Sequence, residues 1–166
     1  MIRNEIEKTA LFLEYEPLLR AMGITLVDIN ELDHGQSVLV TIVIMVKDGE
    51  VNVDHCASVY RLVYPRMELQ LGGKDLKLEV TTPGLQRTIK DIYEFSLFTG
   101  KRVRIYDTSK TVWISGIIKE SNDDSLVLDT VFIEDEKEMI ATMVVDFAEI
   151  KKAKLDYRWE DNSHGN

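Results

Sequence analysis

The chain changes its hydrophobic pattern near residue 90, and this change constrains the fold more than any other feature. The first half mixes helical spacing with short apolar runs. The second half carries mainly short β-like runs separated by turn residues. A chain of 166 residues is long enough for one mid-sized domain or two small ones. We therefore expect two domains, residues 1–90 and 91–160, followed by a polar tail at 161–166.

The first half is expected to follow the order helix, strand, strand, helix, strand. Apolar residues recur at helical spacing over residues 2–22, with a kink or break at Pro17. A second helix is expected to begin at Asp54, which is a suitable N-cap residue. The strands are expected at residues 24–29, 38–46 and 76–82. This order predicts a small sheet covered on one face by two helices.

The second half is expected to be mostly strand. A short helix is expected over residues 91–98, with Gly100 as its stop signal, and β-strand patterns follow. The five expected strands are residues 103–106, 111–119, 125–132, 139–145 and 150–155. Five short strands in so few residues are typical of a small barrel of the Sm or SH3 type. The predicted fold class is therefore α+β, with an α-β-β-α-β domain followed by that barrel.

The charges are acidic overall but basic at the expected domain junction. Twenty Lys and Arg stand against 29 Asp and Glu, and this net charge of -9 disfavours general coating of nucleic acid. A segment of 18 residues nevertheless contains five cations and only two carboxylates, which gives it a local charge of +3. They are Arg87, Lys90, Lys101, Arg102 and Arg104. A patch of this kind suits RNA phosphate, although it is equally typical of a solvated face.

Two further features leave alternatives open. The segment Thr81-Thr82-Pro83-Gly84 follows a predicted strand and predicts a tight reversal in which Gly84 takes a positive φ. It could bind a phosphate with its hydroxyls, or simply direct the chain into the next domain. A smaller basic patch holds Lys151, Lys152 and Lys154, of which the last two are expected to share one strand face.

The aromatic and acidic residues of the second half also have two interpretations. Trp113, Phe132 and Phe147 are expected in the core more than on a stacking surface. The acidic residues from Glu134 to Glu138 predict a solvated hairpin tip. The same residues would also suit a strongly basic protein partner.

Signatures of catalysis are lacking, and we expect no enzyme, no cofactor and no metal. The single cysteine, Cys56, stands next to His55, and adjacent helix positions point about 100° apart. No phosphate-binding loop, dinucleotide-binding loop or serine elbow occurs. The amino terminus carries carboxylates from Glu5 onward, and the longest apolar run, residues 38–46, is too short to span a bilayer. A cytoplasmic protein is expected.

The chain resembles the bacterial ribosome maturation factor RimP family over most of its length. The segment Leu78–Arg87, LEVTTPGLQR, is similar to the family signature LEVSSPGLDR, and residues 95–103 are similar to its F-x-x-F-x-G-K-x-V segment. Threonines replace the paired serines, Gln86 replaces an acid, and Thr88 stands where proline is common. These departures affect the expected contacts of the turn more than the resemblance.

The resemblance implies a non-enzymatic factor for maturation of the small ribosomal subunit, and we expect the protein to be a monomer. Such a factor binds the assembling subunit, helps ribosomal RNA fold and promotes entry of a basic ribosomal protein. Two other functions stay open: an SH3-like adaptor that binds peptides, and an enzyme with an unpatterned carboxylate site. The expected RNA- or ribosome-binding residues are Thr81, Thr82, Pro83, Gly84, Arg87, Lys90, Lys101, Arg102 and Arg104.

Overall fold

The computed structural model describes residues 1–158, so the expected tail at 161–166 lies outside the described residues. The chain forms two compact units. The N-terminal unit is Ile6–Pro83, and the C-terminal unit joins Met1–Glu5 to the chain from Gly84 onward. The chain therefore passes from one compact unit to the other between Pro83 and Gly84. The domain boundary at residue 90 stays a prediction.

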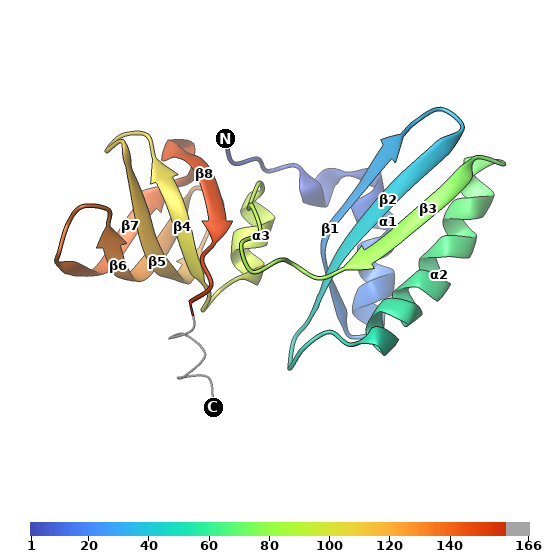
Figure 1. Cartoon of the computed structure of the whole chain (residues 1–166), viewed down its shortest axis with the longest axis horizontal. Coiled ribbons are helices and arrows are strands. Elements are labelled where there is room, and N and C mark those ends of the chain that lie inside the picture. Colours follow the sequence, from blue (N-terminus) through green and yellow to red (C-terminus); the bar gives the residue numbers. More distant parts are fainter. Residues whose placement is uncertain (159–166) are drawn as a thin grey trace. The chain divides into compact units, whose positions relative to one another are not determined.

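The N-terminal unit has the predicted order of elements (Figure 1). They are a 3-10 turn η1 (Ile6–Lys8), α1 (Ala10–Ala21), β1 (Ile24–Asp33), β2 (Ser37–Val46), α2 (Val53–Leu71) and β3 (Asp75–Thr81). The sheet order is β1-β2-β3, with β1 antiparallel and β3 parallel to β2. Val38, Val40 and Ile42 of β2 are buried, whereas the residues between them are half-buried. One face of the sheet thus carries the core of this unit.

The starts of both helices differ from the predictions for a local reason. Helix α1 begins at Ala10 because the Thr9 hydroxyl accepts the Phe12 amide, and the helix continues through Pro17. The N-cap of α2 is Asn52, so the prediction of Asp54 was wrong. Asn52 and His55 exchange reciprocal side-chain bonds to each other's backbone amides, each at 3.0 Å. His55 is therefore part of a helix cap.

The C-terminal unit contains α3 (Ile92–Leu97) and the five predicted strands. The strands are β4 (Arg102–Asp107), β5 (Val112–Ser121), β6 (Ser125–Ile133), β7 (Met139–Asp146) and, after the 3-10 turn η2 (Phe147–Glu149), β8 (Ile150–Leu155). They form an antiparallel sheet in the order β7-β6-β5-β4-β8. Within residues 1–158 no pairing joins β7 to β8. The structure thus establishes an antiparallel sheet in an α+β chain, and closure into an Sm-like barrel stays a prediction.

A hydrophobic core and bulges shape this sheet. Phe95 of α3 packs on Phe147 with ring centroids 5.2 Å apart, and both side chains are buried. The register between β5 and β6 shifts on both sides of Ile117 and Ile118, and such bulges bend a sheet. Gly116 lies at the first shift, where an added Cβ would come within 3.1 Å of the Leu128 Cβ. A side chain at position 116 would therefore crowd Leu128 of β6.

The first five residues form a strap on the C-terminal unit. The Arg3 amide donates to the Lys90 carbonyl, and the Ile92 amide donates to the Arg3 carbonyl, each at 2.8 Å. The Glu5 amide donates to Asp91 Oδ2 at 2.9 Å. The chain then enters the N-terminal unit at Ile6 and leaves it after Pro83. The two units are therefore joined by two chain crossings.

Asp107 organises the turn after β4. Its Oδ1 accepts the Ser109 amide at 2.8 Å, the Ser109 hydroxyl at 2.7 Å and the Lys110 amide at 3.1 Å. Burial alone would raise the pKa of this carboxyl, but these donors and the charge of Lys110 outweigh burial and hold the pKa below its ordinary value of 3.8. The folded state thus favours the ionised form of Asp107.

This carboxylate should make the stability of the protein sensitive to acid. Because the pKa is lower in the folded state, the stabilisation is complete above the unfolded pKa and is lost as pH falls through the folded value. We expect Asp107→Asn to lower the free energy of unfolding by about 1 kcal/mol at pH 7. Urea unfolding at pH 7 and pH 3 should show the difference from wild type shrinking in acid. A pH-independent difference would contradict this account.

Candidate nucleic-acid interface

One face of the C-terminal sheet gathers cations from two distant segments. Along β4, Val103 and Ile105 are buried, whereas Arg102 and Arg104 are half-buried on the opposite face. The antiparallel register places Lys154 of β8 directly opposite Arg104 and Lys152 opposite Tyr106. We call Arg102, Arg104, Lys152 and Lys154 the cationic face. It joins the two basic patches that the sequence shows separately.

Lys151 lies where the alternation of side chains between the two faces of β8 is interrupted. The register between β4 and β8 shifts between Tyr106 and Asp107, which pair with Lys152 and Ile150. Lys151 is thus the extra residue of a bulge. Strict alternation, which would place Lys151 on the face opposite to Lys152 and Lys154, therefore does not apply at this residue.

An aromatic pair lies beside the cationic face. The guanidinium carbon of Arg104 stands 4.5 Å from the Trp113 ring centroid, and Tyr106 meets Trp113 edge to face at 5.4 Å. Arg104 Nη2 also lies 3.5 Å from a carboxylate oxygen of Glu134. Phe147 is buried as predicted, but Trp113 is half-buried and Phe132 is 37% exposed. The prediction that all three aromatics are core residues was therefore wrong.

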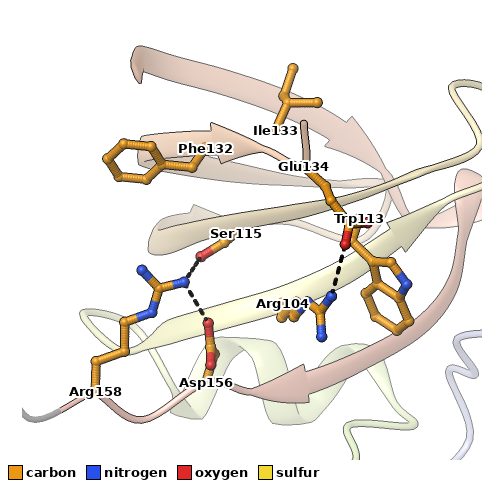
Figure 2. Close-up of a pocket in the computed structure, with 8 residues that line it drawn as sticks. All are labelled: Arg104, Trp113, Ser115, Phe132, Ile133, Glu134, Asp156 and Arg158. Atoms are coloured by element: carbon orange, nitrogen blue, oxygen red, sulfur yellow. Dashed lines mark hydrogen bonds and ion pairs between the residues drawn. The ribbon is translucent and has the colours of Figure 1, made fainter. Parts of the chain in front are cut away.

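A pocket of about 330 Å³ opens next to this pair (Figure 2). Arg104 and Trp113 form one part of its lining, and Ser115 and Phe132 form another. Arg158 follows β8, and its Nη2 donates to the Ser115 hydroxyl at 3.3 Å and to Asp156 Oδ2 at 3.1 Å. Sequence reasoning did not select Ser115 or Arg158, because only the strand register brings them together.

The turn at the end of β3 differs from its prediction. Thr81 and Thr82 are exposed, and the Thr81 hydroxyl donates to the Thr82 carbonyl at 3.4 Å. Gly84 has no positive φ, and the reversal is the turn in which the Arg87 amide donates to the Gly84 carbonyl at 3.0 Å. The expected reversal at Pro83-Gly84 was therefore wrong in position. Thr81, Thr82 and Pro83 belong to the N-terminal unit, and Gly84 begins the other.

Arg87 forms a buried ion pair. Its Nε lies 2.6 Å from Glu94 Oε1, and the two side chains are only 17% and 2% exposed. The second oxygen of Glu94 accepts the Lys90 amide at 3.0 Å. A buried carboxylate needs such partners, since an unpaired charge in the interior is very costly. Arg87 thus neutralises Glu94 and shapes the segment that leads into α3.

The remaining predicted cations, Lys90 and Lys101, have exposed side chains on loops. Lys101 directly precedes Arg102 of β4, and its carbonyl accepts the Ile118 amide at 3.0 Å. Within residues 1–158, no three His, Cys, Asp or Glu side chains are arranged to hold a metal ion. None of the described helices combines the length and apolarity needed to cross a membrane.

The geometry defines a class of protein: a two-unit α+β chain with a cationic, aromatic-edged face on an antiparallel sheet. Comparison with known proteins is more specific. A family model described as the RimP N-terminal domain matches residues 14–86. A Borrelia garinii subsp. bavariensis protein named "Ribosome maturation factor RimP" is 26% identical over 138 residues, which are 83% of this chain and 88% of that relative. The chain is thus similar to the RimP family, over residues 14–86 by the family model and over 83% of its length by this relative.

Proposed function

We propose that the chain is a non-enzymatic ribosome maturation factor that binds the assembling small ribosomal subunit in the cytoplasm as a monomer. Its relative is named a ribosome maturation factor. In this proposal the cationic face contacts ribosomal RNA, Lys90 and Lys101 extend that contact, and Arg87 positions the segment beside them. Thr81, Thr82, Pro83 and Gly84 form the chain crossing next to these residues in sequence.

The main observation behind the proposed RNA contact is the pairing of Arg104 with Lys154 across neighbouring strands. Like charges directly opposite each other destabilise a sheet. Glu134 offsets only part of this charge, from 3.5 Å. An RNA backbone would neutralise the remainder and release its own counterions. A structural role alone would not explain why cations gather here in a chain of net charge -9.

A second contact is proposed for the acidic hairpin tip between β6 and β7. Residues 134–138 are exposed, as predicted, and contain four carboxylates and one lysine. Such a tip is complementary to a basic ribosomal protein and would steer its approach. We further propose that the antiparallel sheet closes into an Sm-like barrel, which would hold the cationic face and the acidic tip on one rigid body.

The alternative of a peptide-binding adaptor would use Tyr106 and Trp113 as an aromatic groove. The Arg104 guanidinium already covers a face of the Trp113 ring, which argues against this use. Titration with proline-rich peptides should therefore leave the tryptophan fluorescence unchanged.

The proposal is tested by sedimentation of the purified protein with free small subunits, free large subunits and whole ribosomes over a range of salt concentrations. We expect migration with free small subunits that weakens as salt rises, because phosphate contacts release counterions. Migration with none of the particles would reject the proposed function. Equal migration with both subunits would reject its specificity.

A further inference from the structure

The pocket beside Trp113 has a floor of one small side chain between larger ones. Ser115 of β5 lies directly opposite Arg104 of β4 and Phe132 of β6. Neighbouring strands are about 4.8 Å apart, so the stems of Arg104 and Phe132 stand roughly 10 Å apart across Ser115. A flat ring with contacts on both faces needs about 7–8 Å between its neighbours. The Arg158 guanidinium already covers the Ser115 hydroxyl, which leaves Ser115 8% exposed, and the slot has room for one planar ring beside that guanidinium.

The walls of this slot suit stacking. Phe132 is 37% exposed although it lies in a strand, so part of its ring is available to a ligand. Figure 2 shows Ser115 between Phe132 and Arg158, whose guanidinium donates to the Ser115 hydroxyl. Aromatic rings and guanidinium planes are the two side-chain surfaces on which unpaired bases stack. The slot therefore offers both stacking partners around a polar floor.

The polar groups of the pocket favour a neutral ring over a simple anion. Glu134 and Asp156 bring two carboxylates to the lining, where they pair with Arg104 and Arg158, so these four side chains carry no net charge that would attract a free phosphate or sulfate. A nucleobase is uncharged and carries N–H groups that carboxylates and the Ser115 hydroxyl can accept. The volume of about 330 Å³ lies at the small end of ligand pockets and suits one base rather than several.

The pocket is continuous with the cationic face. Arg104 lines the pocket and pairs across the strands with Lys154. A base seated over Ser115 would therefore have its neighbouring phosphates within reach of β4 and β8. Single-stranded RNA can turn one base out in this way, whereas a duplex keeps its bases stacked and paired.

We infer that the Ser115 pocket binds one unpaired base of single-stranded RNA, held against Phe132 and Arg158, while the flanking phosphates lie on the cationic face. This inference deepens the proposed function and rests on it. It makes the C-terminal unit selective for unpaired RNA, which electrostatic contact alone does not.

The test measures binding of a fluorescein-labelled, unstructured ten-nucleotide RNA and of its duplex by fluorescence anisotropy. Wild-type protein should bind the single strand more tightly. Phe132→Ala should weaken binding to the single strand about tenfold and leave the duplex unchanged, because one base–aromatic stack is lost. The matched control is Val144→Ala, which removes an exposed apolar side chain of β7 outside the pocket and should change neither affinity.

A second variant, Ser115→Leu, fills the floor of the slot and should weaken single-strand binding to a similar extent. Circular dichroism checks that each variant is folded. If folded Phe132→Ala or Ser115→Leu protein binds both RNAs as tightly as wild type does, the base pocket is overturned. If that affinity still falls with rising salt, the cationic face alone accounts for the binding. If wild-type protein binds neither RNA but migrates with free small subunits, the pocket is rejected and the proposed function stands, whereas migration with none of the particles rejects both.

Discussion

Replacing Arg87 by methionine is expected to lower the free energy of unfolding by about 3–5 kcal/mol, because it leaves the Glu94 carboxylate buried without its cation. Glu94 is only 2% exposed and lies 2.6 Å from Arg87. Glu94→Gln should cost less, since an amide oxygen can still accept the Lys90 amide. Arg87, at 17% exposure, can also reach water. Urea unfolding of the two variants measures this asymmetry.

The matched control for this experiment is Arg20→Met. Arg20 also forms an ion pair with a glutamate, Glu16, but at 3.6 Å and with the arginine side chain 72% exposed. Exposed pairs contribute about 0–1 kcal/mol, so this variant should remain close to wild type. A loss below 1 kcal/mol in Arg87→Met would show that the buried pair does not hold this segment.

The second large effect is expected from reversing two charges of the cationic face. Lys152→Glu combined with Lys154→Glu should weaken binding to free small subunits about 10- to 100-fold at low salt. It should also reduce the slope of log affinity against log salt by about 2, one for each lost phosphate contact. The two proteins should become more similar as salt rises. Quantitative sedimentation over a salt series measures both quantities.

The control must change the net charge equally without touching the cationic face. Lys47→Glu combined with Lys77→Glu does so, because both lysines are exposed in the N-terminal unit. We expect this control to lose much less affinity and to keep the salt slope of the wild type. Equal losses in the two double variants would mean that only the total charge matters, and the cationic face would not be a binding site.

The positions of the strands were predictable from sequence because each carries a local signal. Strand β4, for example, shows alternating apolar residues with turn residues on both sides. This pattern involves only residues that are neighbours in sequence. The same holds for the hairpin between β1 and β2. The helix starts were less predictable, since Asn52 and Asp54 are both good caps and only the reciprocal bond with His55 decides between them.

The candidate site was only partly predictable, because it depends on register. Arg104 and Lys154 are 50 residues apart, and each alone suggests a solvated face. Pairing of β4 with β8 makes them neighbours, and a shift of one residue would have sent Lys154 to the core side. Arg87 was selected for its charge, yet charge alone does not reveal the buried Glu94 that uses it. Long-range pairing carries this information, and no local pattern encodes it.

The strap of residues 1–5 has a consequence for the order in which the chain folds during synthesis. Residues 6–83 form a contiguous unit, so all of its strands and helices are available once Pro83 has been made. Domains generally fold as units, with the N-terminal one first. The strap, however, is synthesised before residues 6–83 and finds its partners only when Lys90, Asp91 and Ile92 emerge. The N-terminal unit is therefore inserted in the chain of the C-terminal unit, and residues 1–5 of that unit cannot pair until residues 90–92 have been synthesised.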